Sequence, residues 1–119
     1  MATLPPLEPS KILKTSSSVQ AKKICFNINT YELPIGVQGE FGVIHHPGAS
    51  IAVPINQDGK IIILRQYRFA VGRRLLEFPA GTLEMGEDPL LAMQRELKEE
   101  SGYDASKWDP LGVMVPCPA

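Results

Sequence analysis

The sequence is poor in cysteine. It holds two, Cys25 and Cys117, among 119 residues. Neither cysteine has a histidine at the spacing of a metal site or of a nucleophile and its base. Because the amino terminus also lacks a secretory signal, the pattern indicates two reduced thiols in a cytoplasmic protein rather than a disulfide framework.

Long hydrophobic runs and a charge excess are also missing. The longest apolar runs, such as residues 61–64, have the length of a strand, which excludes a membrane-spanning helix. The formal net charge of -1 gives no general attraction to nucleic acid or to an anionic membrane. Residues 1–22 are rich in Ser and Lys, so we expect a flexible tail there, with a transit peptide as the alternative.

The remaining residues, 23–119, predict one domain made of strands followed by a helix. Turn residues separate the strands, as in Asn56-Gln57-Asp58-Gly59, which indicates a hairpin. The absence of alternation at 61–64 predicts a strand covered on both faces. Strands are expected over residues 23–33 and 41–45, which form an antiparallel amino-terminal pair within 23–46, and, in a core over 50–119, over 50–55, 60–68, 75–78 and 111–115.

A helix is predicted over residues 90–101. Asp88 followed by Pro89 is typical of a helix start, with the aspartate as N-cap and proline at the first helical position. Gly102 suits the left-handed residue that ends such a helix. The helical period places three apolar residues on a face that should meet the sheet: Leu90, Met93 and Leu97.

The same helix carries an acidic cluster of Glu96, Glu99 and Glu100. Like charges three and four residues apart oppose helix formation by a few tenths of a kcal/mol each, so the cluster is costly. For a short acidic stretch alone, the ordinary interpretation is a solvated helix face. The surrounding residues favour a different one.

The cluster belongs to a longer pattern that begins at Gly81 and resembles the Nudix box, GX5EX7REUXEEXGU, where U is a bulky apolar residue. Leu97 fills the first apolar position, and Tyr103 fills the second, where an aliphatic residue is usual. Seven fixed residues at set spacing arise by chance about once in 10⁸ windows, so the match is very specific. The matching fixed residues are Gly81, Glu87, Arg95, Glu96, Glu99, Glu100 and Gly102.

The resemblance implies a magnesium-dependent pyrophosphohydrolase, with manganese as an alternative metal. Carboxylate and carbonyl oxygens are the ligands that these hard cations prefer. In the family's pattern Arg95 orients a glutamate, and Glu87 braces Arg95 or the loop. The implied metal ligands are Glu96, Glu99, Glu100 and the carbonyl of Ala80 or Gly81.

The residues before the box resemble the subgroup of ADP-ribose pyrophosphatases and related nucleotide-sugar hydrolases. By this resemblance Arg68 contacts the substrate's diphosphate and Glu77 lines the pocket. Pro118 stands about where a proline is associated with ADP-ribose preference in the subgroup. The expected reaction is ADP-ribose to AMP and ribose 5-phosphate. Another nucleotide sugar as substrate, or a non-catalytic nucleotide-binding domain, are the alternatives.

The family's fold is an α/β/α sandwich around a mixed sheet, with the box helix on one face. We expect an incomplete version here, because the family's domain continues well beyond the position that corresponds to Ala119. The resemblance also implies a homodimer in which amino-terminal strands help to build the partner's site.

Overall fold

The computed structural model describes residues 4–116, so Cys117 and Pro118 lie outside the described residues. The chain divides into two compact units. The first unit comprises residues 1–46 and 108–119, and the second unit comprises residues 47–107.

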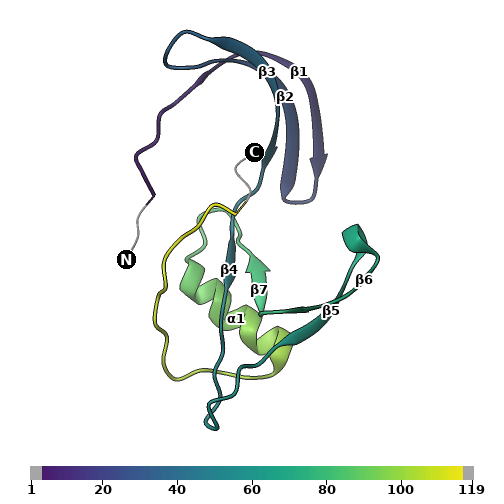
Figure 1. The fold of residues 1–119 in the computed structure, drawn as a ribbon, viewed down its shortest axis with the longest axis vertical. Helices are drawn as coiled ribbons and strands as arrows, with labels where there is room; N and C mark the ends of the chain where they lie inside the picture. Colours follow the sequence, from purple (N-terminus) through teal and green to yellow (C-terminus); the bar gives the residue numbers. More distant parts are fainter. Residues whose placement is uncertain (1–3, 117–119) are drawn as a thin grey trace. The chain divides into compact units, whose positions relative to one another are not determined.

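The first unit is built on a three-stranded antiparallel sheet (Figure 1). Its strands, in the order β1-β2-β3, are β1 (Lys11–Ala21), β2 (Ile24–Glu32) and β3 (Gln38–His45). The predicted antiparallel pair is confirmed, because β2 and β3 pair from Cys25 opposite His45 to Glu32 opposite Gln38.

Strand β1 differs from the flexible tail expected over residues 1–22. It pairs with β2 from Lys11 opposite Glu32 to Ala21 opposite Ile24, and the Ser18 hydroxyl donates to Asn27 Oδ1 at 2.7 Å. Every residue of β1 is exposed. Hydrophobic alternation signals a buried strand face, so a strand that buries none of its side chains leaves no such signal.

The second unit contains two small antiparallel sheets and one helix (Figure 1). The turn over residues 56–59 is confirmed, with Asn56 N–H donating to the Lys60 carbonyl at 2.9 Å, but its flanks form only a bridge between Ile55 and Ile61. The elements are β4 (Ala49–Ile51) paired with β7 (Ala80–Thr82), β5 (Leu64–Arg68) paired with β6 (Arg73–Glu77), the 3-10 turn η1 (Phe69–Val71), and α1 (Pro89–Ser101).

Helix α1 begins and ends where the sequence predicts. The Asp88 carboxylate accepts from the N–H groups of Leu90 and Leu91, Pro89 occupies the first turn, and Gly102 ends the helix with φ 76°. The helix packs against β4 and β7. These contacts place the helix beside strand β7, which carries the first glycine of the Nudix box.

The buried face of α1 is rotated from the predicted one. Met93 and Leu97 are buried as expected, but Leu90 is 46% exposed and Ala92 is buried instead. At about 100° per residue, the arc that contains Ala92, Met93 and Leu97 also contains Glu96 and Glu100. The prediction for Leu90 is wrong: Leu90 projects only about 20° from Leu97, but it stands in the first turn of the helix and its side chain is exposed.

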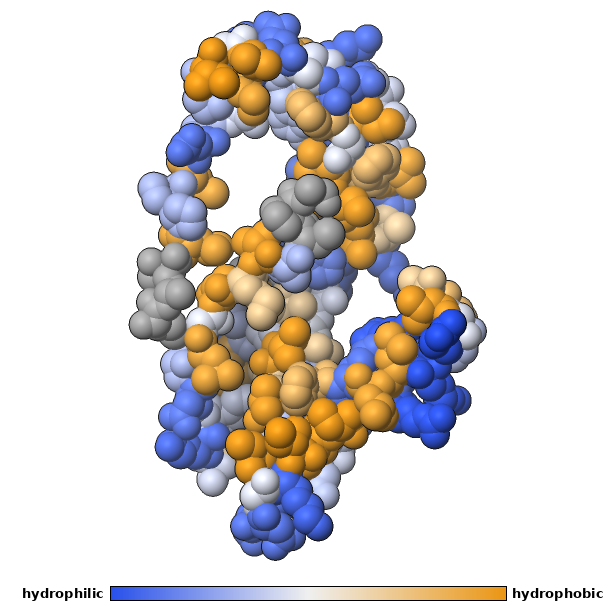
Figure 2. Space-filling model, in the orientation of Figure 1, coloured by the Kyte–Doolittle hydropathy of each residue, from blue (hydrophilic) through white to orange (hydrophobic). Residues whose placement is uncertain are grey.

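Two further strand predictions differ from the structure. Ile61 and Ile63 are 53% and 42% exposed, so the predicted burial on both faces of this segment is wrong. Residues 111–115 form no strand, because no described segment pairs with them. Apolar side chains consequently show at the surface of both units (Figure 2). Among residues 4–116, no helix combines the length and apolar character needed to cross a membrane.

Candidate functional site

The loop before α1 is tied to the helix through Glu87. One oxygen of its carboxylate accepts from the Glu84 backbone N–H at 2.8 Å. The other accepts from Arg95 Nη2 at 3.2 Å. The sequence predicted that Glu87 braces either Arg95 or the loop, and in the structure it contacts both.

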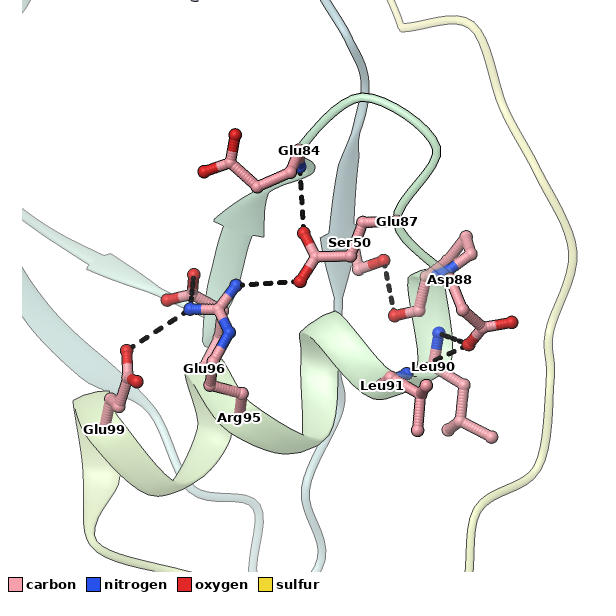
Figure 3. A network of polar contacts seen from close by, with 10 residues as sticks. Ser50, Glu84, Glu87, Asp88, Leu90, Leu91, Arg95, Glu96 and Glu99 are labelled. Atoms are coloured by element: carbon pink, nitrogen blue, oxygen red, sulfur yellow. Dashed lines mark hydrogen bonds and ion pairs between the residues drawn. The ribbon is translucent and has the colours of Figure 1, made fainter.

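Arg95 lies at the centre of a group of three carboxylates (Figure 3). Its Nη1 donates to Glu96 Oε1 at 2.9 Å and to Glu99 Oε2 at 3.4 Å. The hydrogen bonds that Arg95 donates to Glu87 and Glu96 raise the pKa of Arg95 above its ordinary value, against the opposing effect of desolvation. A permanently charged guanidinium therefore fixes three acidic groups of the box relative to one another.

Glu96 also lies directly against the backbone of β7. A Cβ atom placed on Gly81 would stand 2.2 Å from Glu96 Cγ, 2.4 Å from its Cδ and 2.6 Å from its Oε1. Gly81 is buried, so the position has no room into which a side chain could turn. The glycine that opens the box is thus required by the approach of a glutamate that stands in the same box.

Glu100 is half-buried and is held through both carboxylate oxygens. Oε2 accepts from the Ala80 backbone N–H at 3.1 Å, and Oε1 accepts from Gln66 Nε2 at 3.2 Å. Sequence reasoning missed Gln66. The available signal was its position two residues before Arg68 in β5, which places both side chains on one face of the hairpin.

Arg68 and Glu77, the two predicted substrate residues, are brought together. Arg68 Nε donates to Glu77 Oε1 at 2.8 Å and to Oε2 at 3.0 Å, and Nη2 also donates to Oε2. The hydrogen bonds from Arg68 hold the pKa of Glu77 below its usual range. The hydrogen bond to Glu77, and more weakly the charge of Glu100, raise the pKa of Arg68.

The donor set suits a hard divalent cation. Glu96 and Glu99 converge on the same cationic nitrogen, Arg95 Nη1, and carboxylate oxygen is the ligand type that magnesium takes. Within residues 4–116, no three His, Cys, Asp or Glu side chains are gathered closely enough to hold a metal ion. Metal ligation by Glu96, Glu99, Glu100 and Ala80 therefore stays a prediction; the contact found for Ala80 is made by its N–H.

Sequence comparisons agree with the motif. The model of the NUDIX domain matches residues 44–116. An ADP-ribose pyrophosphatase of Bacillus subtilis is 37% identical over 108 residues, which cover 91% of this chain and 58% of the relative. A methanol dehydrogenase activator of Bacillus methanolicus is 34% identical over 99 residues, which cover 83% of this chain and 54% of the relative. The chain thus spans little more than half the length of these relatives.

The fold agrees as well. A crystal structure of an ADP compounds hydrolase superposes with a TM-score of 0.66 at 26% sequence identity, covering 87% of this chain and 57% of that one. The α/β fold class expected from the sequence is therefore confirmed. With the box residues gathered around Arg95 and β7, and with a domain match over most of its length, the chain belongs to the Nudix family.

Proposed function

We propose that this chain carries the catalytic site of a metal-dependent hydrolase of nucleoside diphosphate derivatives, and that its reaction is ADP-ribose to AMP and ribose 5-phosphate. The observation that carries the proposal is the placement of the box glutamates. Glu96 and Glu100 face β7 on the packed side of α1, although surface glutamates ordinarily point to solvent. The named activities of the relatives support the class of substrate.

In this proposal Glu96, Glu99 and Glu100 hold Mg²⁺, or Mn²⁺ in its place. A divalent ion supplies polarisation of the diphosphate and a bound water of lowered pKa. The chain supplies the positioning: Arg95 keeps Glu96 and Glu99 together, and Glu87 anchors Arg95 to the loop. Such fixed charges and donors supply most of the rate in phosphoryl chemistry.

Arg68 is the proposed contact for the substrate's diphosphate. Its guanidinium presents two nitrogens to Glu77, the geometry in which arginine also binds phosphate. Phosphate oxygens would therefore compete with Glu77 for the same face of the guanidinium. Until substrate arrives, Glu77 holds the guanidinium of Arg68 in place.

A non-catalytic role is the second candidate, because one relative is named as an activator of another enzyme. The intact set of Arg95, Glu96, Glu99 and Glu100 favours catalysis, since a binding module has no use for so many like charges near one another. Other nucleotide sugars remain alternative substrates within the catalytic proposal.

Metal removal tests the proposal. The purified chain should release AMP from ADP-ribose with Mg²⁺, stop when EDTA is added, and resume when Mg²⁺ is restored in excess. Glu100→Gln should reduce release to the level seen with EDTA, because it removes a ligand charge. Asp58→Asn, which removes one carboxylate from the turn over residues 56–59, is the matched control and should keep full activity. Equal rates for the chain and Glu100→Gln would reject the enzymatic function.

We also expect a homodimer that forms through the first unit. Exposed aromatic and aliphatic side chains support this, among them Phe26, Phe41 and Ile44 at 39%, 53% and 66% exposure. Light scattering should give twice the mass of one chain, and a single-chain mass at micromolar concentration would exclude the dimer. The cytoplasmic location, and partners limited to small molecules, stay predictions.

A further inference from the structure

One face of strand β5 reaches two acidic groups of the site. Gln66 and Arg68 are two residues apart on this strand, so their side chains share a face. Arg68 contacts Glu77, while Gln66 contacts Glu100 on helix α1. The proposed function uses Arg68 but assigns nothing to Gln66.

Glu100 is held between two separate sheets. Its Oε1 accepts from Gln66 of the β5–β6 pair, and its Oε2 accepts from the Ala80 N–H of the β4–β7 pair. A carboxylate has about four lone-pair sites, so one donor on each oxygen leaves sites that point elsewhere. The two donors therefore set the direction of the carboxylate without using up its capacity as a ligand.

Both groups that donate to Glu100, the Gln66 amide and the Ala80 N–H, are uncharged. Arg95, which holds Glu96 and Glu99, carries a positive charge that repels a cation bound to the same oxygens. An amide orients a carboxylate by hydrogen bonding and adds no net charge. Groups that donate a hydrogen bond to a metal ligand commonly orient that ligand, and their loss costs about 10–100-fold in metal affinity or activity.

We propose that Gln66 is a positioning residue that aims the Glu100 carboxylate at the divalent cation. This inference rests on the proposed function, because it assumes that Glu100 is a metal ligand. It extends the site to strand β5, which also presents Arg68. The strand then sets the geometry of a metal ligand and of the substrate's diphosphate contact together.

Gln66→Met tests the inference, because it keeps the length of the side chain and removes its donor. Titration with Mn²⁺ alone, followed by the electron paramagnetic resonance of the free ion, should show about tenfold weaker binding. A second measurement needs no metal: the amide proton of Ala80, which donates to Glu100, should shift in the NMR spectrum of Gln66→Met as it does in Glu100→Gln. Gln66→Asn, whose donor is drawn back by one methylene group, should change both quantities in the same direction.

The matched control is Gln94→Met, the same chemical change at the glutamine six residues before Glu100 on α1. It should leave Mn²⁺ affinity within about twofold of the parent chain, well below the loss of about 10–100-fold expected when a donor to a metal ligand is removed. An unmoved Ala80 amide in Gln66→Met, or unchanged Mn²⁺ affinity beside a loss in Glu100→Gln, would overturn the role of Gln66. If Glu100→Gln itself binds Mn²⁺ like the parent, the metal site of the proposed function fails instead.

Discussion

Replacing Gly81 by alanine is expected to lower the rate of AMP release by about 100-fold, the loss that a displacement of about 1 Å can cause in a catalytic group. The added methyl carbon would stand 2.2 Å from Glu96 Cγ, far inside van der Waals contact. Because Cγ is close to the helix backbone, the glutamate cannot yield by moving only its carboxylate. Either its χ1 changes or the helix moves away from β7, and both displace a proposed metal ligand.

A double-mutant cycle with Glu96→Gln separates this mechanism from general disruption. If Gly81→Ala acts through the position of Glu96, it should cost little further activity in a chain that already lacks that carboxylate. Equal fractional losses in both backgrounds would contradict the mechanism. The urea midpoint of each variant shows whether stability has changed as well.

Gly81 illustrates what the sequence reveals about this site. Gly81 is recognised from the sequence as a fixed residue of the box, but its contact with Glu96 depends on the distance between a strand and a helix. Local signals were sufficient for the helix ends, since Asp88 and Gly102 act on backbone groups within a few residues. The family resemblance implied that Arg95 orients a glutamate, and in the structure Arg95 contacts Glu96 and Glu99.

Features that depend on contacts between residues far apart in the chain could not be predicted from the sequence. Gln66 meets Glu100 across 34 residues of sequence, and its spacing from Arg68 indicates a shared strand face but not the residue that this face contacts. Strand β1 is ordered by backbone pairing and buries none of its side chains. For Ile61 and Ile63 the prediction was wrong in the opposite way. Their apolar run indicates a buried strand, but both side chains are exposed, because the burial of a strand depends on what packs over it.

Replacing Arg95 by lysine is expected to lower kcat/KM by about 10–100-fold, although the charge is kept. Arg95 donates from Nη2 to Glu87 and from Nη1 to Glu96 and Glu99. A lysine ammonium is a single point on a flexible stem and cannot occupy both nitrogen positions. Glu87 would then be disconnected from the helix, or Glu96 and Glu99 would be left to repel each other. In either case the Mg²⁺ concentration needed for half-maximal rate should rise.

Lys98→Gln is the control for charge, since it removes a cation from the same helix at a position outside the Arg95 network. It should keep nearly full activity. Full activity of Arg95→Lys would show that one positive charge among the carboxylates is enough, and a loss in Lys98→Gln beside it would show that the summed charge of α1 decides the activity. We expect the planar shape of the guanidinium to be required as well as its charge. It joins the loop at Glu87 to two glutamates on the helix at once, so shape, and not charge alone, should decide whether those carboxylates can bind one cation together.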